Sequence, residues 1–235
     1  MDLLGDLTQK PIFPVGQLSP TLHENDDEIG AWDSIQTWFD GQGKNSVVYV
    51  AFRSEAELSQ DDLTELALGL ELSEMPFFWV IRPRTGSAGS VPVELPIGFE
   101  KRVRGRGFVC RSWAPQVKIL AHGSVGVFLS HSGWSSVVEA LRFAKPLVLL
   151  PLGNDQGLNA RFLGEKMIGY SVPRDDTDGS FRRESVAESL RMVAEREEGK
   201  VYREKAMEMS ELFGDMELQD KYVDEFLGYL KTHKD

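Results

Sequence analysis

The sequence predicts an α/β protein built on a doubly wound parallel sheet. Short apolar runs rich in β-branched and aromatic residues, such as 46–52 and 77–81, are typical of strands that are buried on both faces. Amphipathic stretches of helical length lie between such runs. Strands that alternate with helices in this way form parallel sheets with helices on both faces.

Further elements follow in order along the chain. Ser59 with Asp62 resembles a capping box, and it opens a helix with apolar residues at helical spacing, namely Leu63, Leu66, Ala67 and Leu70. A Gly/Ser/Pro loop is expected at 83–93. Further strands are expected near Phe108 and at 125–129, 147–150 and 169–172. Helices are expected at 115–122, 135–143 and 156–167, followed by long charged helices over 182–232.

Residues 1–33 are expected to form loops. They contain a proline-marked, extended connector at 10–16 and an acidic turn at 23–28. The last predicted helix carries an apolar stripe of five residues, Tyr222, Val223, Phe226, Leu227 and Leu230. This stripe either packs on its own domain or needs a surface that is absent from this chain.

Composition narrows the possible partners. The net charge of −11 makes the chain a poor binder of nucleic acid or anionic membranes. The longest apolar run, 146–152, is far shorter than the ~20 residues of a membrane-spanning helix, and the N-terminus lacks the features of a signal peptide. The single cysteine, Cys110, excludes an internal disulfide and predicts a buried core thiol. We therefore expect a cytoplasmic protein without stable membrane insertion.

Polar residues follow three of the predicted strands, at the sheet edge where open parallel sheets bind ligands. Segment 130–136 leads into a helix, whose N-terminal N–H groups and dipole suit a diphosphate. Gly133 lets the backbone come close, while His131, Ser135 and Ser136 can donate hydrogen bonds. A plain helix cap without a ligand explains this segment equally well.

The other two strand ends are ambiguous when each is taken alone. Trp113 stands between a strand and a proline-started helix, where its ring could stack on a flat base, although a buried core tryptophan is the favoured interpretation. Asp155 and Gln156 offer acceptors and donors to sugar hydroxyls, or they form another helix cap.

The motifs of several other kinds of binding or catalytic site are absent from the sequence. No G-x-G-x-x-G follows a strand, and neither a G-x-x-x-x-G-K-[ST] loop nor a G-x-S-x-G elbow is present. The four histidines, at 23, 122, 131 and 233, show no metal-ligand spacing. We expect no metal and no cofactor.

A longer resemblance joins the three strand ends. From Trp113 to Gln156, over 44 positions, the chain reads WAPQVKILAHGSVGVFLSHSGWSSVVEALRFAKPLVLLPLGNDQ. This segment resembles, without a gap, the signature of the UDP-glycosyltransferases of plant secondary metabolism. Residues 11–54 and the helix after Ser59 are also similar to the family's linker and to the first strand of its C-terminal domain. The resemblance covers nearly the whole chain but only the C-terminal half of a family member.

The resemblance implies the C-terminal, Rossmann-like domain of a two-domain GT-B fold. Residues 1–33 would be a remnant of the interdomain linker and 34–214 the UDP-sugar-binding domain. Residues 215–235 would be a helix that packs toward the missing N-terminal domain. The implied reaction is an inverting transfer from a UDP-sugar, a co-substrate rather than a cofactor, to a small-molecule hydroxyl.

By the same resemblance, the nucleoside would lie at the first strand end. Trp113 would stack on uracil, and the backbone of Ala114 would bond to the edge of the base. Glu139 would hold the ribose hydroxyls, with Gln116 close to it.

The remaining implied contacts concern the diphosphate and the sugar. His131, Ser135 and Ser136 would bind the diphosphate, helped by Gly133 and by Ser54 after the first strand. Trp134, Asp155 and Gln156 would line the sugar.

Two positions depart from the family's pattern. Ser135 replaces the usual Asn, and its shorter hydroxyl can still reach a phosphate oxygen. Arg53 replaces the usual Gly before Ser54. Its side chain either crowds a loop that needs close backbone approach or pairs with phosphate, and we favour crowding.

The family's catalytic base is a His oriented by an Asp in the first domain, and no residue of this chain matches that pair. His23, in an acidic loop, is no substitute. We therefore expect no catalytic residue here, an inactive isolated chain, and acceptor binding through the missing domain. One alternative is a non-catalytic UDP-sugar-binding module, which would bind another chain through the apolar stripe. Another is an inactive truncated product.

The subgroup is suggested by segments 48–56, 68–72 and 131–134. They are similar to the branch that adds a sugar to an existing sugar on plant glycosides, which includes rhamnosyltransferases. Gln156 is common in glucose users, so glucose and rhamnose both remain candidates.

Overall fold

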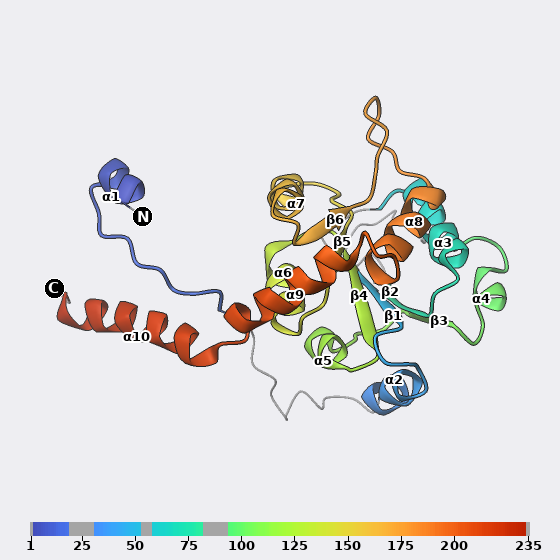
Figure 1. Cartoon of the computed structure of the whole chain (residues 1–235), viewed down its shortest axis with the longest axis horizontal. Helices are drawn as coiled ribbons and strands as arrows, with labels where there is room; N and C mark the ends of the chain where they lie inside the picture. The colour runs from blue at the N-terminus through green and yellow to red at the C-terminus, as the bar shows by residue number, and fades with distance from the viewer. Residues whose placement is uncertain (1, 19–30, 53–57, 82–93, 234–235) are drawn as a thin grey trace, which may run out of the picture.

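The computed structural model describes residues 2–18, 31–52, 58–81 and 94–233. Its centre is a sheet of six parallel strands in the order β3-β2-β1-β4-β5-β6 (Figure 1). The strands are β1 (Val47–Ala51), β2 (Phe77–Val80), β3 (Gly107–Cys110), β4 (Val125–Ser130), β5 (Leu147–Leu149) and β6 (Gly169–Ser171). This confirms the predicted doubly wound parallel sheet. The strand order reverses between β1 and β4, and ligands bind beside such a reversal.

Helices cover both faces of the sheet. One face packs against α3 (Gln60–Ser73), α4 (Phe99–Arg102) and α8 (Arg183–Ala194). The opposite face packs against α2 (Ala31–Asp40), α5 (Gln116–Ala121), α6 (Trp134–Arg142), α7 (Gln156–Glu165) and α9 (Lys200–Phe213). Alternate residues of each strand therefore enter two separate apolar cores.

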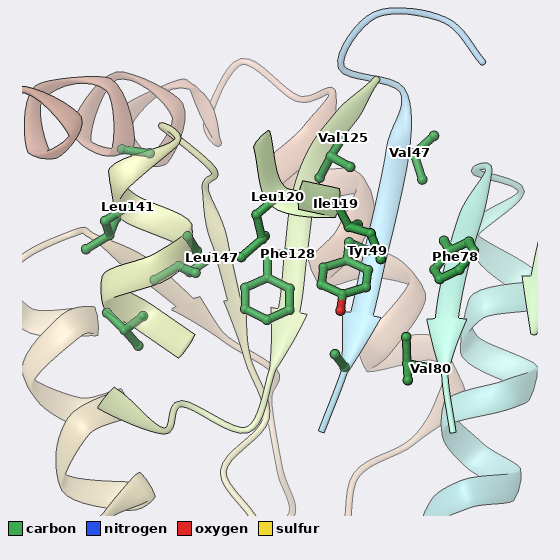
Figure 2. Packing of buried hydrophobic residues seen from close by; sticks show 14 of the residues in the cluster. Val47, Tyr49, Phe78, Val80, Ile119, Leu120, Val125, Phe128, Leu141 and Leu147 are labelled. Carbon is green, nitrogen blue, oxygen red and sulfur yellow. The ribbon is translucent and has the colours of Figure 1, made fainter. Parts of the chain in front are cut away.

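The core between the sheet and helices α5 and α6 is rich in aromatic side chains (Figure 2). Tyr49 of β1 stacks on Phe128 of β4, with ring centroids 5.1 Å apart and planes inclined by 14°. Full burial of one such side chain contributes roughly 1.5–3 kcal/mol. The core therefore holds the strand ends in fixed positions, from which the polar loops extend.

Two local predictions are confirmed in detail. Ser59 and Asp62 form the capping box of α3, with the Ser59 hydroxyl accepting from the Asp62 N–H over 3.0 Å. Cys110 is a buried thiol at the end of β3.

The expectation that residues 1–33 form only loops is wrong. Residues Asp2–Thr8 form helix α1, and α2 begins at Ala31. The signal for α2 was present, because Ile35 and Phe39 lie on one helical face and are buried in the core. Helix α4 was also missed, since four residues are too few to show a period. The predicted turn at 23–28 and the loop at 83–93 lie outside the described residues.

The C-terminal helix α10 (Met216–Thr232) extends away from the body of the domain, and residues 9–18 run alongside it (Figure 1). The Phe13 ring lies 4.4 Å from that of Tyr229 and 6.1 Å from that of Phe226. Leu227 and Leu230 remain 42% and 45% exposed. The apolar stripe is thus covered in part by the connector of the same chain, and not by the domain core. The domain boundaries stay predictions.

No helix in the described parts of the chain is long and apolar enough to span a membrane.

Candidate functional site

Three polar loops begin at the carboxyl ends of three strands of the sheet. They follow β3 at 111–115, β4 at 131–133 and β5 at 150–155. Because all six strands are parallel, these loops lie at the same edge. Ser54 and Arg53, which follow β1, lie outside the described residues.

Trp113, in the first loop, is 47% exposed. The interpretation as a buried core tryptophan is therefore wrong, and a large part of the indole surface is available to a ligand. The neighbouring Ala114 is buried and belongs to the core beneath the loop. Pro115 precedes α5 and makes no side-chain cap.

Gln116 connects the first loop to helix α6. Its Nε2 donates to Oε2 of Glu139 over 2.6 Å and to the hydroxyl of Ser136 over 3.3 Å. The hydroxyl of Tyr49 donates to Oε1 of Gln116 over 3.4 Å. The Glu139 carboxylate is thereby oriented through one oxygen, and no described residue donates to the other. A carboxylate held in this way can accept from a pair of hydroxyls.

Gly133 packs against the imidazole of His131. A Cβ at position 133 would lie only 2.5 Å from Nε2 of His131, so a larger residue cannot stand there unless the ring moves. The sequence had suggested that Gly133 serves close approach to a ligand. The structure shows a close approach to His131, which is itself buried.

Among the described residues, no side chain caps the N-terminus of α6. Its N-cap residue is Gly133, and no side-chain cap bond forms there. The segment is thus a helix cap made by a glycine, and ligand binding there stays a prediction. The first N–H groups of the helix remain available to an anion. Trp134 and Ser135 are exposed beside them, whereas Ser136 is buried with Gln116.

Ser132 was not predicted as part of the site. It has a left-handed backbone, with φ of 68°, and it is fully buried. Within the described part of the chain, its hydroxyl has no hydrogen-bond partner. A buried unpaired hydroxyl is costly, and the sequence offers no signal that distinguishes it from the serines around it.

The side chain of Gln156 folds back and hydrogen-bonds to the backbone of the third loop. Its Oε1 accepts from the backbone N–H groups of Leu152 and Gly153, over 2.8 and 3.1 Å. The carbonyl side of this amide is therefore occupied, and the NH₂ side is what remains for a ligand. Asp155 is exposed and is the N-cap residue of α7, as one interpretation expected, but its side chain makes no cap bond to that helix.

Asn159 joins the third loop to the second. Its Nδ2 donates to the carbonyl oxygen of Ser132 over 3.1 Å and to Oδ2 of Asp155 over 3.0 Å. Sequence reasoning missed this residue, because an Asn in the second turn of a helix has no distinctive pattern. Asn159 thus links the second and third loops directly, and Gln116, at the start of the helix after the first loop, links that helix to α6.

Among the described residues, no group of three or more His, Cys, Asp or Glu side chains could hold a metal ion. The ligand chemistry that remains is an exposed aromatic ring, a helix N-terminus and side chains that bind hydroxyls. Such a set suits a nucleotide that carries a further polyhydroxylated group.

Comparison with known proteins defines the class. The family model described as "UDP-glucoronosyl and UDP-glucosyl transferase" matches residues 19–226, so the chain belongs to that family of UDP-dependent hexosyltransferases. It is 52% identical to UDP-glycosyltransferase 91A1 of Arabidopsis thaliana over 234 residues, which cover 100% of this chain and 50% of that protein. It is 44% identical to the soyasaponin III rhamnosyltransferase of Glycine max, covering 100% of this chain and 50% of that protein.

Solved structures agree with this family. The fold superposes on TcCGT1 in complex with UDP with a TM-score of 0.84 and 30% identity, covering 98% of this chain and 52% of that one. Phytolacca americana UGT2, complexed with UDP-2-fluoro-glucose and pterostilbene, gives a TM-score of 0.71 and 34% identity, covering 89% of this chain and 44% of that one. The predicted fold, the C-terminal domain of a GT-B glycosyltransferase, is thereby confirmed. The chain spans about half the length of the curated relatives it matches.

Proposed function

We propose that this chain binds a UDP-sugar at the carboxyl edge of its sheet and serves as the donor-binding half of a glycosyltransferase. The hydrogen bonds that join the second loop to the third through Asn159, and the helix after the first loop to α6 through Gln116, carry this proposal. They bring an exposed indole, an uncapped helix N-terminus and hydroxyl-binding side chains into one site, in the order in which a nucleotide sugar presents base, diphosphate and hexose.

The nucleoside occupies the first loop. Uracil stacks on the exposed face of Trp113, and the backbone of Ala114 bonds to its edge. The ribose hydroxyls donate to Glu139, whose orientation is set by Gln116. Stacking of a base on an aromatic ring is worth about 1–3 kcal/mol, which makes Trp113 the main anchor of the base.

The diphosphate lies at the N-terminus of α6. Backbone N–H groups there, the hydroxyl of Ser135, and His131 with Ser54 supply donors to the phosphate oxygens. The chain as a whole is acidic, so its overall field repels the ligand and these local donors must bind it. The sugar lies against Trp134, Asp155 and the NH₂ group of Gln156.

In the complete enzyme this arrangement stabilises the leaving UDP. Negative charge grows on the β-phosphate as the glycosidic bond breaks, and donors placed in advance at the helix N-terminus offset it. A base must also take the proton from the acceptor hydroxyl, and at this edge His131, Glu139 and Asp155 are committed to the phosphate, the ribose and the sugar. We assign the base and the glycoside acceptor to an N-terminal domain, and glucose or rhamnose to the donor. We also place the protein in the cytoplasm.

Calorimetry on the purified chain tests donor binding. UDP should bind measurably, and Trp113→Ala should weaken it by about ten- to a hundredfold if the ring stacks on the base. Trp113→Phe, which keeps a flat ring, should recover part of the affinity. UDP-glucose and UDP-rhamnose compared in competition identify the donor. Failure of the wild-type chain to bind UDP, or full affinity in Trp113→Ala, would contradict the proposal.

A further inference from the structure

Arg174 lies just beyond the last strand, next to the third loop of the site. The Val172 N–H donates to the Leu149 carbonyl over 2.9 Å, so pairing of β5 with the chain after β6 ends there. Two residues later, the half-buried Arg174 reaches across to the carboxyl end of β5. Its guanidinium lies 5.4 Å from the centre of the buried Phe181 ring.

The guanidinium holds two carbonyl oxygens on either side of it. Nη2 donates to Pro151 over 2.5 Å, and Nη1 donates to Gly179 over 2.5 Å. Within the described residues Arg174 forms no ion pair, and its Nε is buried without a partner. Burial lowers the pKa of Arg174, against a smaller opposing effect of Asp62. A partly buried cation without a paired carboxylate is costly, and the bonds to Pro151 and Gly179 with the Phe181 ring are the contacts that offset this cost.

Pro151 is the first residue of the third loop beyond the sheet. Leu150 still donates to the Ser130 carbonyl over 2.8 Å, and no strand pairing follows it. From there, Gln156 holds the N–H groups at 152 and 153, and Asn159 holds the carboxylate of Asp155. Both of these residues belong to the loop or to the helix that follows it. Among the described residues, Arg174 is the one outside this loop and α7 that hydrogen-bonds to the loop beyond Leu150.

We propose that Arg174 is a positioning residue for the sugar of the donor, acting through the carbonyl of Pro151 on the loop that presents Asp155 and Gln156. This inference rests on the proposed function. Without the charge-assisted hydrogen bond to Pro151, the start of the loop is released and the sugar contacts lose their alignment. Contacts to UDP arise from the loops at 111–115 and 131–133 and from α6, none of which Arg174 hydrogen-bonds, so they are unaffected.

Calorimetry of variants with UDP, UDP-glucose and UDP-rhamnose separates the two effects. For Arg174→Ala we expect the Kd of the preferred UDP-sugar to rise about tenfold, the size of losing a charge-assisted hydrogen bond. The Kd of UDP should stay within about twofold, which also shows that the variant folds. Arg174→Lys, which can reach one carbonyl, should recover part of the loss.

Arg161→Ala is the matched control. Arg161 lies on α7 near the same loop, is exposed, and among the described residues pairs only with Glu165, over 3.0 Å. Its removal changes the net charge equally and should leave all three Kd values unchanged. Amide hydrogen exchange at Leu152 and Gly153 should quicken in Arg174→Ala and not in the control.

Three results would overturn the inference. Unchanged UDP-sugar affinity in Arg174→Ala would show that the loop does not depend on this residue. An equal loss of UDP and UDP-sugar affinity would show a general structural role. If the wild-type chain binds no UDP, the proposed function fails and this inference falls with it, an outcome that the wild-type measurement reveals before any variant is compared.

Discussion

Asn159 and Ser132 are joined by a hydrogen bond of 3.1 Å between the side-chain amide of one and the backbone carbonyl of the other. The same amide nitrogen donates to the carboxylate of Asp155. One side chain thus sets the spacing between the loop at the α6 N-terminus and the loop that we assign to the sugar. The distance between diphosphate and hexose in a bound donor depends on that spacing.

Replacing Asn159 should disturb both loops at once. Asn159→Asp keeps the shape but loses the donating NH₂ group and brings a second carboxylate beside Asp155. We expect UDP-sugar affinity to fall by about tenfold or more, because each lost hydrogen bond contributes about 0.5–1.5 kcal/mol. Calorimetry measures this affinity directly. Wild-type affinity in Asn159→Asp would show that donor binding does not depend on the hydrogen bonds of Asn159 to the two loops.

Gln156 offers an isosteric test of sugar recognition. In Gln156→Glu the carboxylate can still accept from the N–H groups of Leu152 and Gly153, but it has no NH₂ group to donate to the sugar. We expect the melting temperature and the Kd of UDP to stay the same, and the Kd of the UDP-sugar to rise about tenfold. Equal binding of the UDP-sugar by both proteins would remove Gln156 from the sugar site.

Gly133 should not tolerate a methyl group. The added Cβ would lie 2.5 Å from Nε2 of the buried His131, which forces the ring to move. For Gly133→Ala we expect a loss of roughly 1–3 kcal/mol in the free energy of unfolding together with weaker UDP binding. Chemical denaturation and calorimetry check the two effects.

Gly157→Ala is the control for this change. It lies in α7, and a Cβ there would meet no atom within 4 Å. Alanine in a helix is favoured over glycine by about 1 kcal/mol, so this variant should be as stable as the wild type or more so. If both variants behaved alike, the packing of Gly133 against His131 would not matter.

Lys145 makes stability depend on pH in the alkaline range. It is buried, donates to the carbonyls of His122 and Val125, and burial lowers its pKa to about 8. Between pH 8 and its usual value near 10.4, the unfolded chain binds more protons than the folded one, so the free energy of unfolding should rise with pH. Denaturation curves of wild type and Lys145→Met over this range isolate the effect, because the other groups cancel. A difference that is flat with pH would contradict it.

Arg53 distinguishes two interpretations of the first strand end. If its side chain crowds the diphosphate, Arg53→Gly should tighten UDP binding. If the guanidinium pairs with phosphate, the same change should weaken UDP binding by about tenfold or more. Wild-type affinity in Arg53→Gly would mean that neither interpretation holds.

Much of the fold was predictable because its signals are local. Buried strands such as β1 are continuous apolar runs, and the capping box of α3 is encoded in four adjacent residues. Helix α2 was missed although Ile35 and Phe39 show its period, because the segment follows a stretch dominated by turn residues. Helix α1 exposes Leu3 and Leu7, so it lacks the pattern of buried apolar residues from which a helix is predicted.

The sequence predicted the main residues of the site, but not the hydrogen bonds that position its loops. Trp113, His131 and Gln156 stand out by residue type and by their place after strands. Asn159 and Arg174 act through carbonyl oxygens of residues 27 and 23 positions away. A contact to backbone oxygen imposes no pattern on the partner's side chain, so only the folded arrangement reveals it.

The most direct test of the account is a crystal structure of this chain with a bound UDP-sugar. We predict uracil against the Trp113 ring, the diphosphate at the first N–H groups of α6, and the hexose beside Asp155 and Gln156. A nucleotide bound away from the carboxyl edge of the sheet, or one that contacts only one of the three loops, would contradict it.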